Sequence, residues 1–187
     1  MKKLMLFCFI GAFAVASTVV SAQEKALLGN GNFAVKLDYI YFTDNHFDGA
    51  AGPYFGLEGY GKIASNLYLG GEIGSGTDVN LGGEDITFVP VELNLKYANE
   101  VARKFVVDVG AGLSYSYVGI QYSPLFGTYG KERNDWLFGG QIFADLTYKI
   151  NWFSIGVNGK YQLTESFKDE GIDLSNFRLG VQLGIVF

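Results

Sequence analysis

The amino-acid sequence predicts an all-β protein, an eight-stranded antiparallel transmembrane β-barrel with up-and-down topology. Apolar residues recur at every second position in eight segments, and a period of two places them on one face of a strand. The opposite faces carry charged residues and glycine. The connections alternate between short and long, which is typical of barrels that cross a membrane. The length of 187 residues fits a single domain.

The eight apolar faces follow one another along the chain. The last is the clearest, because every second residue from Phe177 to Phe187 is apolar. Faces of about five to seven residues match the strands of roughly 9–11 residues that a bilayer requires. The predicted faces span residues 33–41, 55–63, 67–73, 89–97, 105–117, 136–148, 153–161 and 177–187.

Aromatic residues gather at the two ends of these segments, as they do at the two interfaces of a membrane. Tyr97, Tyr148, Phe153 and Phe187 are expected at one end, and Tyr41, Phe55, Tyr117, Trp136 and Tyr161 at the other. The brief connections are residues 64–66, 98–104 and 149–151. The longer polar ones are residues 43–53, 75–84, 118–135 and 164–173.

A secreted soluble sandwich is the alternative, because its polar faces would meet water. Charged residues make up only 18% of the chain, against roughly 25% in ordinary soluble domains. No stretch after the N-terminal segment is apolar enough for a transmembrane helix, so a spanning chain must close its sheet and leave no open edge. Pro90 fits poorly within the fourth strand and predicts a bulge or a position near the rim.

The polar faces predict a lumen filled by a network of paired charges, since a barrel of eight strands is just wide enough for its side chains. Closure should bring Lys36 and Arg178 together on the first and last strands, so Arg178 is expected to pair with Glu58 or Asp38. The predicted network comprises Lys36, Asp38, Glu58, Lys62, Glu72, Glu92, Lys96, Asp108, Asp145, Lys160 and Arg178.

Residues 1–22 have the layout of a secretory signal peptide, with Lys2 and Lys3 before an apolar run and small residues before Gln23. An N-terminal membrane anchor is the alternative. The barrel domain then spans residues 23–187, lacks cysteine and carries a net charge of −7. The negative charge argues against binding of nucleic acid. The lack of cysteine excludes disulfides and thiolate metal sites from this domain.

The eight alternating segments, the long loops and the terminal Phe187 resemble the small outer-membrane barrels of the OmpA/OmpX type. The resemblance covers residues 23–187 and rests on pattern, since no diagnostic motif is present. It implies a porin-like monomer in the outer membrane of a Gram-negative cell envelope, in contact with membrane lipid and lipopolysaccharide. It also implies that the strand ending in Phe187 is the signal read by the barrel-assembly machinery.

For function, the sequence favours a non-enzymatic protein with a closed lumen, whose extracellular loops contact ligands or the envelope. A narrow channel for ions or small solutes is the alternative. A barrel enzyme that modifies lipid A is a third possibility, and it would have to use His46, the one histidine. The segment from Asp44 to Gly49 begins like a calcium loop, but Phe55 stands where a glutamate ligand is required. No catalytic, cofactor or metal residues are therefore predicted.

Overall fold

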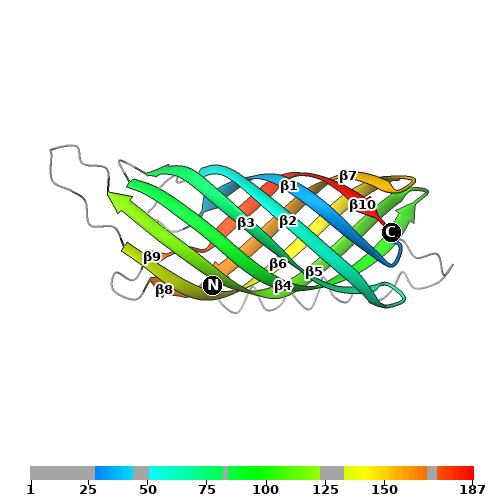
Figure 1. Cartoon of the computed structure of the whole chain (residues 1–187), viewed down its shortest axis with the longest axis horizontal. Coiled ribbons are helices and arrows are strands. Elements are labelled where there is room, and N and C mark those ends of the chain that lie inside the picture. Colours follow the sequence, from blue (N-terminus) through cyan, green and yellow to red (C-terminus); the bar gives the residue numbers. More distant parts are fainter. Residues whose placement is uncertain (1–27, 44–50, 82–83, 123–132, 168–171) are drawn as a thin grey trace.

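The structure is a computed structural model that describes residues 28–43, 51–81, 84–122, 133–167 and 172–187. Eight antiparallel strands form a closed barrel in the order β1-β10-β7-β6-β5-β4-β3-β2, which confirms the predicted fold class (Figure 1). The barrel strands are β1 (Gly31–Phe42), β2 (Ala51–Ala64), β3 (Leu67–Leu81), β4 (Glu84–Ala102), β5 (Phe105–Tyr122), β6 (Arg133–Ile150), β7 (Phe153–Thr164) and β10 (Asn176–Val186).

Pairing between β1 and β10 closes the sheet. The two strands are aligned without interruption over eleven residue pairs, from Asn32 opposite Val186 to Phe42 opposite Asn176. Each remaining strand pairs with its neighbours in sequence, so the topology is up-and-down. Closure leaves none of the eight barrel strands with an unpaired edge, which is the condition for a sheet in lipid.

The two faces of each strand follow the predicted alternation. Large apolar side chains are exposed on the outer face, and the residues between them point into the barrel and are buried. Leu37, Leu93 and Leu179, for example, are each more than half exposed, whereas Lys36, Glu92 and Arg178 are buried. On β5, twelve residues separate Phe105 from Tyr117, about 40 Å of strand or about 30 Å at a typical tilt. That height suits the hydrocarbon core of a bilayer.

The two ends of the barrel differ. Short turns join β2 to β3, β4 to β5 and β6 to β7 at one end, and we call this the short-turn end. The opposite ends of the strands, where the longer connections begin and end, lie on the left of Figure 1, and we call this the long-loop end. Leu28 and the C-terminal Phe187 both lie at the short-turn end, where the amide groups of Asn30 and Gly31 donate to the Phe187 carbonyl oxygen.

Several strands extend further than the alternation predicts. β3 and β4 remain paired as far as Leu81 and Glu84, so the predicted loop over residues 75–84 is almost entirely strand. Residues 98–102, predicted as part of a turn, likewise continue β4. Between β7 and β10, β8 (Ser166–Phe167) and β9 (Ile172–Asp173) form a separate two-stranded sheet that the sequence did not predict. Backbone pairing in these hairpins does not require apolar alternation, and the sequence therefore did not reveal it.

Pro90 lies within β4, and the predicted bulge does not fall at this residue. Pro90 is aligned with Ser116 of β5 in an uninterrupted register. On the β3 side, no residue pairs are formed between Val91 and Phe88, but the register is the same on both sides of this gap, and the register shift lies further along, between Gly76 and Val79. The gap contains the residue that has no N–H to donate. No described residue belongs to a helix that is long and apolar enough to span a bilayer.

Gly70 illustrates why small residues are needed on the inner side of the wall. It lies opposite Tyr60, whose ring packs inside the barrel. A Cβ atom at Gly70 would overlap the Gly59 carbonyl oxygen and the Tyr60 ring. Gly61, by contrast, has no heavy atom near the place where a Cβ would lie.

Replacing Gly70 by alanine should therefore lower the free energy of unfolding by about 1–3 kcal/mol, the usual range for overpacking. Gly61→Ala is the matched control and should leave stability unchanged or raise it by up to about 1 kcal/mol. Urea titration of the folded barrel in detergent micelles, followed by tryptophan fluorescence, measures both. Equal effects of the two substitutions would contradict the close packing at Gly70.

Candidate functional site

The lumen holds ten charged residues, and every strand of the barrel supplies at least one. They occupy inward positions of the alternation, and each is less than 9% exposed. The set is Lys36 and Asp38 on β1, Glu58 on β2, Glu72 on β3, Glu92 and Lys96 on β4, Asp108 on β5, Asp145 on β6, Lys160 on β7 and Arg178 on β10.

Like charges lie side by side on neighbouring strands. Glu72 is directly opposite Glu58 on one side and Glu92 on the other, so three carboxylates form a row across β2, β3 and β4. On the far wall, Arg178 of β10 is directly opposite Lys160 of β7. Directly opposed like charges are unfavourable within a sheet. The acidic row and the basic pair must therefore neutralise each other across the lumen.

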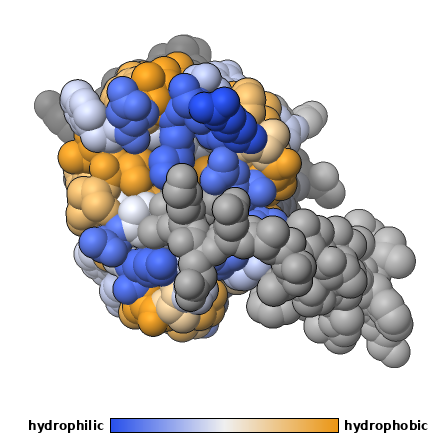
Figure 2. Space-filling model, turned by 90° about the vertical axis from the view of Figure 1, so that its right-hand side faces the viewer, coloured by the Kyte–Doolittle hydropathy of each residue, from blue (hydrophilic) through white to orange (hydrophobic). Residues whose placement is uncertain are grey.

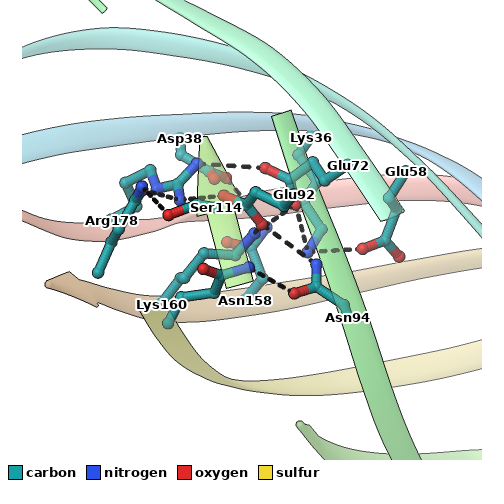
Figure 3. Close-up of polar contacts among 12 residues, drawn as sticks. Lys36, Asp38, Glu58, Glu72, Glu92, Asn94, Ser114, Asn158, Lys160 and Arg178 are labelled. Carbon is teal, nitrogen blue, oxygen red and sulfur yellow. Dashed lines mark hydrogen bonds and ion pairs between the residues drawn. The ribbon is translucent and has the colours of Figure 1, made fainter. Parts of the chain in front are cut away.

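Four of these residues form a closed cluster (Figure 3). The ammonium group of Lys160 lies 2.6 Å from Glu72 Oε2 and 2.5 Å from Glu92 Oε2. The guanidinium of Arg178 contacts the other oxygens, at 3.2 Å from Glu72 Oε1 and 2.5 Å from Glu92 Oε1. Both carboxylates thus bind both cations, and all four side chains are at most 3% exposed. We call this set the central cluster.

Polar and aromatic neighbours complete the coordination of the central cluster. The Tyr54 hydroxyl donates to Glu72 Oε1 over 2.9 Å, and the Arg178 guanidinium lies 4.5 Å from the centre of the Tyr54 ring. Arg178 also donates to Gln162 Oε1, while the Gln162 amide donates to Ser114 and Ser116. These contacts hold the guanidinium in one orientation, because its donors face fixed acceptors.

Lys36 and Lys96 form ion pairs with a second group of acids nearer the short-turn end. Lys36 lies 2.8 Å from Glu58, 3.5 Å from Glu72 and 3.6 Å from Asp145. Lys96 lies 3.6 Å from Glu58 and 3.8 Å from the centre of the Tyr60 ring. Glu72 links this group to the central cluster, so the ion pairs form one continuous network.

Acids outnumber bases in the described lumen, with six carboxylates against four cations. Asp108 and Asp145 lie directly opposite each other on β5 and β6, and both oxygens of Asp145 accept no hydrogen bond from the described protein. A cavity of about 10 Å³ is bordered by Asp108, Glu58 and Lys96. That volume suffices for about one water molecule.

Buried apolar side chains form one cluster on each side of the charged layer. The long-loop cluster consists of Ile40, Phe42, Tyr54, Ile86, Phe88, Val118, Ile120, Leu137 and Leu174. The short-turn cluster consists of Leu28, Tyr60, Tyr68, Ala98, Val106 and Phe143. The amide of Leu28 donates to the Tyr68 hydroxyl over 3.3 Å, which ties the segment before β1 across this opening.

Two predictions about the network are wrong. Arg178 does not pair with Glu58 or Asp38 but reaches across the lumen to Glu72 and Glu92. The register explains this, because Arg178 lies opposite Ile40 on β1 and is offset from Lys36 along that strand. Asp38 instead accepts a hydrogen bond from Asn158.

Lys62 is the second correction. Lys62 occupies an inward position of the alternation, but it lies near the end of β2 and is half-buried. It joins no ion pair in the described part of the chain. The alternation predicts whether a side chain points into the barrel, but it does not predict how far the residue lies from the end of the barrel.

Sequence reasoning missed the aromatic and apolar residues that line the lumen. Tyr54, Tyr60 and Tyr68 occupy inward positions of the same alternation as the lumen charges, and this pattern could have identified them. The sequence analysis considered aromatic residues only as part of the membrane interfaces. Residues 1–22, which the sequence predicts as a signal peptide, lie outside the described residues, as do His46 and the segment from Asp44 to Gly49.

No protein-family model matches the sequence, and no curated protein matches it significantly. Solved structures do match. Neisserial surface protein A superposes with a TM-score of 0.67 at 10% identity, covering 84% of this chain and 96% of that one. The N-terminal β-barrel domain of Pseudomonas aeruginosa OprF gives 0.58 at 12% identity, covering 85% and 98%. Yersinia pestis Ail, the attachment invasion locus protein, gives 0.53 at 10% identity, covering 83% and 98%. The chain therefore has the fold of the small eight-stranded outer-membrane barrels.

The central cluster predicts a large stability effect at Arg178. Arg178→Met should lower the free energy of unfolding by about 3–5 kcal/mol, because Glu72 and Glu92 would each lose a buried partner. Lys62→Met, at the rim, should change it by less than about 1 kcal/mol. The double variant with Arg178→Met and Glu92→Gln should lose less unfolding free energy than the sum of the losses in the two single variants. Urea unfolding in micelles provides the comparison, and strictly additive effects would contradict the pairing.

Proposed function

We propose that the mature protein is a non-enzymatic integral protein of a bacterial outer membrane, with a closed lumen and a working surface formed by its long loops. The fold supports the outer-membrane location, since the solved structures that it resembles are outer-membrane barrels. The exposed apolar band supports a membrane-spanning position, because water would be a poor solvent for so many large side chains.

The packing of the described lumen is the observation that supports a closed interior. An ion-pair network fills the middle of the barrel, and a cluster of buried apolar side chains lies on each side of it. A conducting pathway needs water or polar groups along its whole length, so buried apolar clusters favour a lumen that does not conduct. The interior therefore serves to hold the barrel together, and recognition is left to the loops.

The chemistry of the long-loop end supports contact with the cell envelope. The chain segments at this end are strongly acidic, so they would meet the phosphate groups of lipopolysaccharide through bridging divalent cations. Two of the proteins with this fold are described as a surface protein and as an attachment invasion locus protein. Those descriptions favour a role at the cell surface for this chain as well.

The route to the membrane follows from the same proposal. Residues 1–22 would direct export and be removed, and the barrel-assembly machinery would recognise the last strand. Phe187 suits that role because its side chain is 65% exposed at the end of the chain. Closure within one chain also favours a monomer, since β1 and β10 satisfy each other's edges.

The closed lumen predicts that the purified barrel produces no conductance steps in a planar bilayer. A positive control is a variant that opens the lumen without changing its net charge. It combines Phe88→Ala and Phe143→Ala with the paired changes Glu92→Ala and Arg178→Ala, which removes part of each apolar cluster and one ion pair. This variant should admit water and conduct. Regular conductance steps from the unmodified protein would favour the narrow channel instead.

The non-enzymatic assignment predicts that lipid A is unchanged by this protein. Mass spectra of lipid A from cells with and without the gene should be identical. Loss or gain of an acyl chain that depends on the gene, and that disappears with His46→Ala, would identify a lipid-modifying enzyme.

A further inference from the structure

The charges of the barrel domain are separated into layers along its axis. Segments 43–50, 77–85, 119–135 and 164–175, at the long-loop end, contain eleven acidic and three basic residues, a net charge of −8. The ten lumen residues carry −2. Segments 62–66, 98–104 and 149–152, at the short-turn end, contain four basic residues and one acidic residue, a net charge of +3.

Every short turn combines a basic residue with an exposed apolar side chain. Lys62 precedes Ile63, which is 56% exposed, and Arg103 and Lys104 follow Val101, which is 57% exposed. The third turn carries Lys149 beside Ile150 and Trp152, the latter 68% exposed. Figure 2 views this end and shows hydrophilic residues across it with hydrophobic ones towards the outside of the barrel. We call these three turns the basic rim.

Neighbouring turns of the basic rim are physically joined. The Lys149 amide donates to the Lys104 carbonyl oxygen over 2.8 Å, which fixes the third turn against the second. Glu100 is the acid of this rim; its carboxylate accepts a hydrogen bond from the backbone amide of Lys104 and interacts electrostatically with Lys149. Arg103 is exposed, and the rim keeps an excess of positive charge because four basic residues face this one acid.

We propose that the basic rim binds the headgroups of anionic phospholipids in the leaflet that surrounds the short turns. This inference rests on the proposed membrane-spanning function. The exposed Trp152 and Ile63 place the rim at the level where acyl chains meet headgroups. Each basic side chain at that level raises the local concentration of anionic lipid by up to about a few-fold. The Debye length sets the distance over which this attraction acts. A free phosphate ion would gain nothing from the apolar half of the rim.

The opposite end makes the lipid preference specific to one leaflet. The long-loop segments repel anionic headgroups, so enrichment should occur around the short turns alone. The two tryptophans of the chain report on the two ends separately. Trp152 lies in the basic rim, and Trp136 lies near the long-loop end, stacked on Tyr115 with ring centres 4.9 Å apart.

The test uses quenching of each tryptophan by brominated lipid. Barrels with Trp136→Phe or Trp152→Phe are folded into phosphatidylcholine vesicles that contain a minority of phosphatidylglycerol, with bromine on one lipid class at a time. Because both leaflets have the same composition, the direction of insertion does not matter. Per mole of lipid, brominated phosphatidylglycerol should quench Trp152 about two- to fivefold more than brominated phosphatidylcholine. Trp136 should show no such preference.

Two further measurements bear on the cause of the preference. Replacing Lys62, Arg103, Lys104 and Lys149 together by glutamine should bring the Trp152 quenching ratio close to one. About 1 M salt should do the same in the unmodified rim, because it shortens the Debye length to about 3 Å. Equal quenching of Trp152 by both lipids, or a ratio that survives both treatments, would overturn the inference. If neither lipid quenched either tryptophan, the membrane-spanning proposal itself would fail, and the inference with it.

Discussion

Closure of the sheet is the constraint from which the other features of this barrel follow. Lipid offers no hydrogen-bond partner to an open strand edge, so β1 and β10 must pair along their length. Their eleven aligned pairs complete the cylinder. Once it is complete, the polar face of every strand points into a space too narrow for bulk water. The lumen charges are thereby removed from solvent, and each must find a partner inside the barrel.

The partners are found across the lumen more than along the wall. Glu58, Glu72 and Glu92 would repel one another in an open sheet, since they are direct cross-strand neighbours. In the closed barrel, Lys160 and Arg178 reach them from the opposite wall. The network therefore stabilises the closed form specifically, because an opened sheet would separate the acidic row from the basic pair. Burial of these side chains lowers the dielectric constant around them and strengthens the contacts.

The same cylinder gives the molecule two chemically different ends. The sequences of the long connections are acidic, whereas the short turns combine basic residues with exposed apolar side chains. The interior contributes little to this asymmetry, since its charges are largely paired.

The sequence by itself determined the architecture and the inward or outward direction of almost every strand residue. Alternation has a period of two whatever the neighbours are, so the positions of Lys36, Glu72 and Arg178 on the inner face could be predicted locally. Only the tertiary structure decided their partners and depth. The stagger of the closed sheet offsets Arg178 from Lys36 and brings it to Glu72 and Glu92, and strand tilt places Lys62 at the rim. The inward Ile86, Phe88 and Ile120 likewise form a cluster only when distant strands meet. Register and stagger depend on the closed cylinder as a whole, and no single strand encodes them.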